Sequence, residues 1–577
     1  MATELISLGI LFLCAIIGGI IANRFKQPAV FGLLLVGAIA GPSALNLVED
    51  QSMVSMMAEF GAILLLFVIG LEFDASKLIN LGARPLLIGF MKFAFVLFFG
   101  YQATLLLGLG PKVGLFIGAI LSFSSTVVVV KVLEQKHMYS RREVPLLISV
   151  LIIEDIIAVF ILTFFSGIKD TSVSLLSTFE NIIFSIAVLV ISYIIIMKLL
   201  RYLIPLILKN NKDESTFAFL SLAIGASFSY FAASLGISPS AGAFLAGSLI
   251  ASLPNSKEYG KAVHPYSLIF TSIFFISMGT MVDLKAVHVN LPLIIVLLVT
   301  VLISRFIAIG FLTYLVANFK NDQPFFSSIA MISVGEFSLL VAKESHKFVP
   351  ETDLVSITAS IIFLSAIIMS FGINYSENVR SKVVQRTPKL TILKLESIAS
   401  YLRRFFDYLE IENFFTKKLR HESRVAFLYL SCFTLLLFAL RRGTSFIVGL
   451  VPSYVDYAVY FIYGCIVLYM IYVLYTKFLA VHSTLSVILT HVDSSRNLRK
   501  CTKILNCMLK ALVMFFAGML FPFAIFAFNL GFWANFIPFA ILFLSFYYLK
   551  KVMNLIDAGS NSVSISHKPS LVFSKFL

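Results

Sequence analysis

The feature that most constrains this chain is the run 145–167, which is apolar throughout except for the adjacent Glu154 and Asp155 near its centre. A run of this length can cross the hydrocarbon core of a bilayer as one helix. At a rise of ~1.5 Å per residue, both carboxylates would then lie roughly 15 Å from water. Because a carboxylate at that depth is costly, the pair indicates a site that takes up protons or cations inside a membrane. A buried structural ion pair is the alternative interpretation.

Composition extends the membrane assignment to the whole chain. Of its 577 residues, 59% are hydrophobic and 13% are charged, whereas roughly a quarter are charged in a soluble domain. The runs also lack the alternating pattern of an outer-membrane barrel, so the expected fold class is an all-α polytopic membrane protein. The net charge of +15 comes from basic loops, which reflect topology, so no nucleic-acid partner is expected. The five cysteines lack metal-ligand spacing, and no cofactor is expected.

The distribution of apolar runs divides the chain into four regions. Residues 1–373 form a first membrane section with about 13 spans, and residues 374–424 form a strongly basic cytoplasmic linker. A second membrane section of four spans and unknown role covers 425–550, and the Ser-rich tail 551–577 is expected to be disordered. The expected spans are 5–21, 29–48, 58–73, 86–107, 112–132, 145–166, 182–207, 216–235, 240–253, 266–282, 291–318, 325–343 and 354–373, followed by 425–440, 454–475, 508–530 and 532–549.

Basic residues in the loops predict the topology. Lys and Arg are concentrated in every second loop of the first section and are few in the loops between. Because positively charged loops stay on the cytoplasmic side, we expect the N-terminus outside the cell and the C-terminus in the cytoplasm. The expected location is the plasma membrane. The basic linker either forms amphipathic helices at the inner membrane surface, in contact with membrane lipids, or is a simple charged connection.

Three short motifs recur in the first section at an offset of about 210 residues, and the matching spans lie an odd number of spans apart. They are GLLLVG (32–37) with GAFLAG (242–247), FVIGLEFD (67–74) with FISMGTMVD (275–283), and SFSST (122–126) with SVGEF (333–337). An odd separation makes the two halves face opposite ways in the membrane. Such inverted repeats are typical of secondary transporters.

Two corresponding spans are expected to be broken helices. Span 112–132 carries the hydroxyl side chains of the 122–126 motif, which compete for backbone hydrogen bonds. Span 325–343 carries Gly335 and Glu336 between apolar runs. Broken backbone at that depth leaves carbonyl oxygens and helix-end dipoles available to an ion. Small residues that allow close helix packing are the alternative interpretation of both motifs.

Taken together, these residues resemble the monovalent cation–proton antiporter superfamily, and within it the branch that contains Kef-type potassium–proton and NapA-like sodium–proton antiporters. The resemblance covers most of residues 5–373 and none of the chain after 374. It is carried by PAVFGLLLVGAIAGPSAL (28–45), LLLFVIGLEFD (64–74), SSTVVVVKVL (124–133), IIEDIIAVF (152–160), SPSAGAFLAG (238–247), FFISMGTMVDL (274–284) and SVGEFSLLVA (333–342).

The resemblance implies an inverted-repeat fold in which a core bundle with two crossed broken helices moves like an elevator against a dimerisation bundle. It implies that Asp155 is the ion-binding aspartate. Glu154 stands where NapA-like members have a second Asp and Kef-like members have Gln, which leaves the choice of cation open. Arg305 stands where a basic residue can pair with the first carboxylate. A homodimer is implied as well, and the Gly-rich faces of spans 29–48 and 240–253 are the expected interface.

The expected site binds Na⁺, K⁺ or Li⁺ through oxygen atoms in competition with H⁺. Asp155 is the metal ligand, with Ser125 and Thr126 as helpers and Ser124 as a weaker candidate. Glu154 and Asp155 could both release protons, which would exchange two protons for one cation. Arg305 is expected to hold Glu154 ionised instead, so that one proton exchanges for one cation. Gly335 and Glu336 support the break, and three roles for Glu336 stay open: sensing pH, lining the cytoplasmic path or stabilising the break.

One further charge and the competing functions complete the sequence-based expectations. Lys92, near the start of span 86–107, is expected to extend to the inner membrane surface. A cation channel could use the same carboxylates, and a receptor or sensor could be built from the second membrane section with the first as its effector. An enzyme is not expected, because an intramembrane aspartyl protease needs acids on facing spans and these acids are adjacent on one helix.

Overall fold

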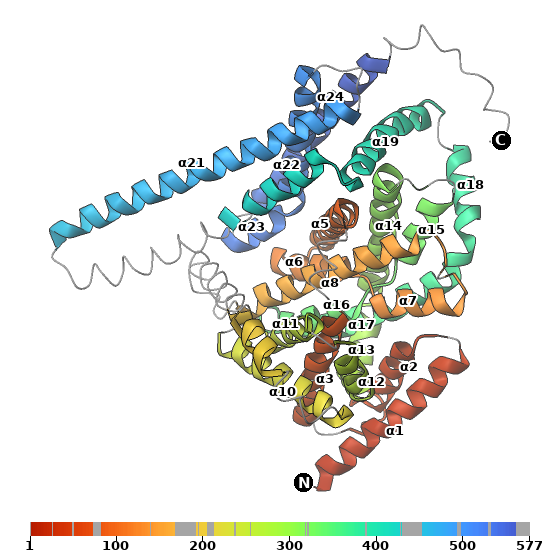
Figure 1. Cartoon of the computed structure of the whole chain (residues 1–577). Helices are drawn as coiled ribbons and strands as arrows, with labels where there is room; N and C mark the ends of the chain where they lie inside the picture. Colours follow the sequence, from red (N-terminus) through yellow and green to blue (C-terminus); the bar gives the residue numbers. More distant parts are fainter. Residues whose placement is uncertain are drawn as a thin grey trace. The chain divides into compact units, whose positions relative to one another are not determined.

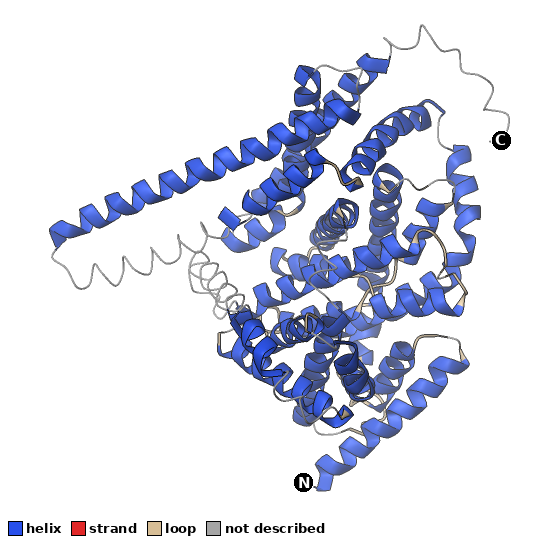
Figure 2. Ribbon diagram, viewed as in Figure 1, coloured by secondary structure: helices blue, strands red, loops and turns tan. Residues whose placement is uncertain are grey.

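In the computed structural model, the described residues form helices, drawn as coiled ribbons, and the connections between them (Figures 1 and 2). It divides into two compact units, one of residues 1–313, 319–384 and 522–530, the other of residues 314–318, 385–521 and 531–577. The described residues are 2–25, 27–48, 51–72, 82–138, 140–167, 192–193, 195–204, 213–235, 238–253, 256–317, 319, 322–386, 389–426, 428–429, 453–492, 498–528 and 532–560.

The first unit contains the helices of the first membrane section. Three helices, α14, α18 and α23, straddle its borders. The helices are α1 (Ala2–Arg24), α2 (Ala29–Ala40), α3 (Gln51–Glu72), α5 (Ala83–Leu106), α6 (Pro111–Ser122), α7 (Thr126–Gln135), α8 (Val144–Gly167), α10 (Glu214–Ser234), α11 (Pro239–Ala251), α12 (Ser256–Thr280), α13 (Leu284–Val289), α14 (Leu291–Val316), α15 (Gln323–Ala330), α16 (Glu336–Ser345), α17 (Leu354–Gly372), η1 (Ile373–Tyr375), α18 (Ser376–Arg386) and α23 (Phe521–Phe528).

The number of spans differs from the sequence-based expectation. Nine of the described helices are long and apolar enough to cross a membrane, or ten if the bent α12 counts as one. Each expected span of the first section except the seventh coincides with one described helix or one broken pair. The seventh, 182–207, lies largely outside the described residues. Six of the nine lie in the first section. Thirteen full-length spans are not observed among its described residues, because the fifth and twelfth are each cut into two short helices and some others, such as α2 and α11, are short.

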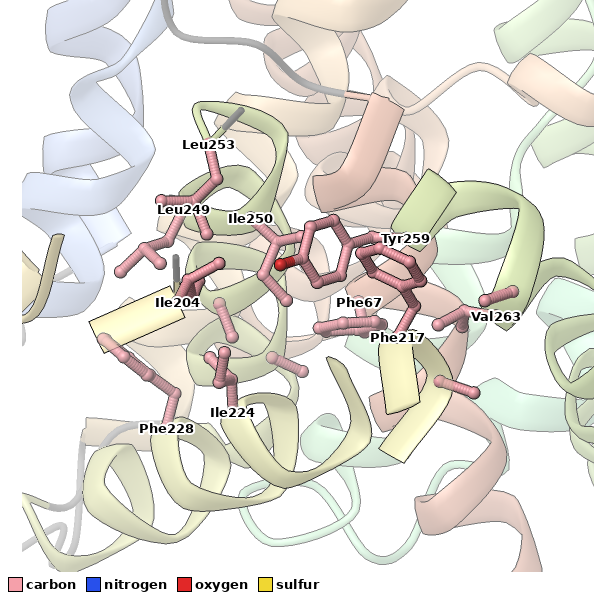
Figure 3. Packing of buried hydrophobic residues seen from close by; sticks show 14 residues of the cluster. Phe67, Ile204, Phe217, Ile224, Phe228, Leu249, Ile250, Leu253, Tyr259 and Val263 are labelled. Atoms are coloured by element: carbon pink, nitrogen blue, oxygen red, sulfur yellow. The ribbon is translucent and has the colours of Figure 1, made fainter. Parts of the chain in front are cut away.

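Contacts sort the helices of the first unit into two groups. In one group α3 packs against α11 and α12, α10 against α11, and α1 and α2 against each other and α12. In the other, α5 packs against α6 and α8, and α16 packs against α6, α8 and α17. Figure 3 shows the apolar core of the first group, where the rings of Phe217 and Tyr259 meet edge to face with centroids 4.8 Å apart. The second group contains the charged side chains of the site described below, except Arg305, which lies on α14.

Glycines of the repeated motifs bring the two halves of the first unit together. A Cβ atom added at Gly37 would lie 2.4 Å from the Ile276 oxygen and 3.0 Å from the Gly279 Cα. Its repeat mate Gly247 meets Gly70 in the same way, since an added Cβ would lie 2.1 Å from the Phe67 oxygen. These glycine faces are therefore occupied within the chain. The expected homodimer interface on spans 29–48 and 240–253 stays a prediction and would have to use other side chains of these spans, such as the exposed Leu35 and Ile39.

The second unit is helical as well, with α19 (Lys389–Glu410), α21 (Ser453–Val492), α22 (Leu498–Met519), η2 (Phe532–Phe536) and α24 (Ile537–Ser560). Arg403 of α19 donates two hydrogen bonds, of 2.7 and 3.2 Å, to the carbonyl of Tyr314, near the end of α14. The expected start of the disordered tail, residue 551, lies inside α24. Residues 561–577 and most of the expected span 425–440 lie outside the described residues.

Candidate ion-binding site

The two expected broken helices exist, and they cross at their breaks. The first break separates α6 from α7 over residues 123–125, and the second separates α15 from α16 over residues 331–335. The Ser125 amide donates to the Ser333 oxygen at 3.1 Å, and the Gly335 amide donates to the Phe123 oxygen at 2.9 Å. An added Cβ at Gly335 would lie 2.4 Å from the Ser124 oxygen. Only glycine allows this approach.

A contact at the crossing reflects the internal repeat. The Ser125 hydroxyl donates to Glu336 Oε2 at 3.0 Å, and these two residues are 211 positions apart. This separation equals the offset of the repeated motifs, so the residues that meet here are repeat mates. The pseudo-two-fold axis of the inverted repeat therefore passes through the crossing, as in transporters that bind their substrate between two repeats.

Arg305 of α14 joins the carboxyl-terminal ends of both half-helices and is fully buried. On the α6 side its guanidinium donates to the oxygens of Leu121 (3.1 and 2.6 Å) and Phe123 (2.6 Å). On the α15 side it donates to the oxygens of Met331, Ile332 and Ser333 at 3.2, 3.2 and 2.7 Å. Helix carboxyl ends expose carbonyls without intrahelical donors and carry partial negative charge. Arg305 therefore clamps two helix ends.

Lys92 of α5 is the ion-pair partner of Glu154, and both side chains are buried. The Lys92 ammonium lies 2.7 Å from Glu154 Oε2, 2.6 Å from the Ser122 carbonyl and 2.9 Å from the Ser124 hydroxyl. The Ser124 amide also donates to Glu154 Oε2 at 2.9 Å. Two expectations are therefore wrong. Lys92 does not extend to the membrane surface, and Glu154 pairs with Lys92 while Arg305 donates to backbone carbonyls and, at 3.2 Å, to the Ser124 hydroxyl that Lys92 also contacts.

Asp155 lies beside the start of the second half of the first broken helix. Its side chain is only 7% exposed, and the Thr126 hydroxyl lies 3.2 and 3.4 Å from its two carboxylate oxygens. Thr126 is the first residue of α7, whose N-cap Ser125 accepts a hydrogen bond from the Val128 amide. The amino-terminal end of a helix carries partial positive charge. The half-helix therefore favours a carboxylate at this position.

Glu336 is the first residue of α16 and the third buried carboxylate of the crossing. Oε2 accepts the Ser125 hydroxyl, and Oε1 finds no hydrogen-bond donor among the described residues. Its position at a helix amino terminus stabilises negative charge. The role of stabilising the break agrees with this geometry, and the other two roles stay predictions.

The residues expected to form a single ligand set are divided among three carboxylates. Thr126 contacts Asp155, Ser125 contacts Glu336, and Ser124 contacts the Lys92–Glu154 pair. The residue that the sequence reasoning placed wrongly is Lys92. A signal was present, because Lys92 is the single charged residue of the apolar run 86–107. Such a residue inside a span usually faces the bundle interior.

Outside the spans, Arg141 links the loop before α8 to the start of α15. Its Nη2 donates to Glu143 Oε1 at 3.0 Å and to Asp322 Oδ2 at 2.7 Å, and its guanidinium carbon lies 3.9 Å from the Phe326 ring centroid. Burial lowers the pKa of Arg141, but hydrogen bonds and charge from Glu143 and Asp322 outweigh burial, so the pKa lies above its usual value. This stable cation holds two site helices at one end.

Comparisons with known proteins agree with the resemblance seen in the sequence. The family described as "Sodium/hydrogen exchanger, transmembrane" matches residues 9–375. The probable Na⁺/H⁺ antiporter GerT of Bacillus cereus is 28% identical over 58% of this chain and 88% of its own length. K⁺ efflux antiporter 5 of Arabidopsis thaliana is 28% identical over 59% of this chain and 61% of its own length.

Among solved structures, the sodium proton antiporter MjNhaP1 of Methanocaldococcus jannaschii is similar with a TM-score of 0.47 and 17% sequence identity. The similarity covers 66% of this chain and 99% of that one. The family match spans more than half of the chain and includes every buried charge of the crossing. The chain therefore belongs to the sodium/hydrogen exchanger family, and it is a multi-pass monovalent cation/proton antiporter and not an enzyme.

Proposed function

We propose that this antiporter exchanges Na⁺ or K⁺ for protons, with Asp155 as the carboxylate that the two kinds of ion share. The observation that carries the proposal is the position of Asp155, almost buried, against the Thr126 hydroxyl at the start of a half-helix. Carboxylate and hydroxyl oxygens suit hard cations. A proton on the same carboxylate removes its charge, so cation and proton compete for it.

The choice between Na⁺ and K⁺ is kept open in the proposal because the relatives differ. GerT is named a probable Na⁺/H⁺ antiporter, and the Arabidopsis relative is named a K⁺ efflux antiporter. The described ligands, one carboxylate and one hydroxyl, suit both ions and also Li⁺. Selectivity would then depend on oxygen atoms that complete the shell when the ion is bound.

We further propose that the two helix groups of the first unit move against each other as an elevator in the plasma membrane. The group around α5, α6, α8 and α16 would carry the site, and the group around α3, α10, α11 and α12 would be the fixed support of a homodimer. The distribution of basic loops supports an outer N-terminus and a cytoplasmic C-terminus. A single-subunit mass for fully active protein in lipid nanodiscs would contradict the homodimer.

Reconstitution into vesicles that contain a pH-sensitive dye tests the proposed function. Adding Na⁺, K⁺ or Li⁺ outside should move protons out of the vesicles in the wild type, and Asp155→Asn should abolish this flux. The matched control is Asp213→Asn, because Asp213 is an exposed N-cap of α10 and Asn caps helices about as well as Asp. Exchange that persists in a folded Asp155→Asn protein would disprove the assignment of the site.

A further inference from the structure

The surroundings of Lys92 have the composition of a cation-binding site. Its ammonium contacts a carboxylate oxygen of Glu154, a carbonyl oxygen of Ser122 and a hydroxyl oxygen of Ser124, all within 2.9 Å. An ammonium has three donors and no acceptor, so each proton has one oxygen partner. Carboxylate, carbonyl and hydroxyl oxygens are also the ligands that hard metal cations take in proteins. We call these three oxygens the Lys92 cage.

The cage and the proposed transport site are neighbours on opposite sides of one helix break. Glu154 and Asp155 are adjacent on α8. Glu154 accepts from the Ser124 amide just after α6 and is joined to the Ser122 carbonyl through Lys92, whereas Asp155 faces the start of α7 through Thr126. Adjacent residues on a helix point about 100° apart. One helix therefore presents two carboxylates to two different oxygen clusters, of which one already holds a positive charge.

We propose that Lys92 is a tethered cation that permanently fills a second cation site, so that Asp155 alone exchanges ions. This inference rests on the proposed function. The charges of the described crossing agree with it, since the buried groups are two cations, Lys92 and Arg305, and three carboxylates, Glu154, Asp155 and Glu336. With every group ionised the net charge is −1, which one monovalent cation or one proton neutralises. Exchange is then one for one.

A purely structural ion pair is the competing explanation for Lys92 and Glu154. Buried ion pairs contribute little net stability, while removal of one partner leaves an uncompensated charge. The two explanations differ in what happens when the ammonium is removed. A structural pair leaves a damaged core, whereas a tethered cation leaves an empty cage that a free cation can enter.

The test is the number of Na⁺ ions bound per protomer, measured with radioactive Na⁺ on purified full-length protein. The wild type should bind one, and Asp155→Asn should bind none. Adding Lys92→Met to Asp155→Asn should restore binding of one Na⁺, because the cage is now open. Adding Glu154→Gln to that pair should remove it again. A folded Lys92→Met/Asp155→Asn protein that binds no Na⁺ would overturn the proposal.

Thermal unfolding covers the case in which Lys92→Met is poorly stable. A cation that binds only the folded protein raises its stability by mass action. The unfolding temperature of Lys92→Met should therefore rise with NaCl or KCl more steeply than that of the wild type and should not respond to choline chloride. The cation response should disappear in Lys92→Met/Glu154→Gln. Equal responses of Lys92→Met to Na⁺, K⁺ and choline would overturn the proposal. The proposal would also be overturned if Lys92→Met could not be obtained folded in any salt while Lys92→Met/Glu154→Gln folds.

The outcomes separate this inference from the proposed function. If the wild type shows no cation-dependent proton flux but the cage in Lys92→Met binds Na⁺, the proposed function fails and the second site stands. If flux depends on Asp155 and the opened cage stays empty, the exchange reaction stands and Lys92 is a structural partner of Glu154.

Discussion

Replacing Arg305 by Met should destabilise the crossing of the two broken helices. Arg305 is the hydrogen-bond donor that the structure gives to the carbonyl oxygens of Leu121 and Ile332, and it shares the oxygens of Phe123 and Ser333 with backbone amides. Met keeps about the length of the aliphatic part of Arg but has no guanidinium and donates no hydrogen bond. The substitution therefore leaves at least two buried carbonyls without their donor and removes the positive charge from two helix ends.

The expected loss can be estimated from these contacts. A buried acceptor that loses its partner costs ~1–3 kcal/mol, so two carbonyls correspond to roughly 2–6 kcal/mol before any relaxation. Loss of the charge at two helix carboxyl ends adds about 0.3–1 kcal/mol for each end. Arg305→Lys should be intermediate, because a single ammonium keeps the charge but cannot reach both helix ends as the wider guanidinium fork does.

The assay is the temperature at which purified protein stops eluting as a single species after heating. Arg305→Met should lower this temperature clearly. The matched control is Arg142→Met, because Arg142 is exposed in the loop before α8 and its replacement should leave the temperature unchanged.

A double variant separates the clamp from the expected charge pair with Glu154. If Arg305 were the counter-ion of Glu154, Glu154→Gln would recover stability in the Arg305→Met background. If Arg305 holds the two helix ends instead, adding Glu154→Gln should lower the stability further, because the carbonyls stay unpaired and Lys92 loses its carboxylate. Recovery in the double variant, or an Arg305→Met protein as stable as the control, would refute the reasoning.

Three further predictions concern packing, ligand and domain. Gly37→Ala should lower the unfolding temperature, because its Cβ would lie 2.4 Å from a backbone oxygen and such overpacking costs ~1–3 kcal/mol. The control is Gly19→Ala, whose Cβ would have nothing within 4 Å. An equal loss of stability in both variants would contradict the contact between repeats. Thr126→Val should raise the cation concentration for half-maximal proton flux roughly fivefold, because the loss of one hydrogen-bonding ligand costs ~1 kcal/mol. Thr126→Ser keeps the hydroxyl and should leave this concentration unchanged. An unchanged concentration for Thr126→Val would show that Thr126 is not part of the site. A chain ending at residue 386, where α18 ends, should still exchange ions. A folded truncation without flux would make the removed residues, which include the second unit and α23 of the first, part of the machinery.

The breaks and the carboxylates could be predicted from the sequence because their signals are local. Hydroxyl residues in 122–126 and Gly335 interrupt apolar runs, and the structure breaks both helices there. The repeat offset also predicted a contact, since Ser125 and Glu336, which are one repeat apart, are hydrogen-bonded at the crossing. Such features follow from residue type and spacing alone.

The partners of the buried charges could not be predicted, because they depend on which face of a helix packs inward. Position along α5 suggested that Lys92 lies near the membrane surface, but packing of α5 against α6 and α8 turns it toward Glu154. Arg305 was expected to pair with the Glu154 carboxylate, whereas it donates hydrogen bonds to five carbonyl oxygens at two helix ends. The glycine faces likewise found partners within the chain.

Proton release on cation binding tests the central claim most directly. Na⁺ or K⁺ is added to purified, weakly buffered protein at a series of starting pH values, and a pH indicator counts the protons released per protomer. If cation and proton share Asp155, the wild type and Asp213→Asn should release up to one proton in a saturable way, and Asp155→Asn should release none. Cation binding to the wild type without proton release at any pH, or equal release by Asp155→Asn, would contradict the account.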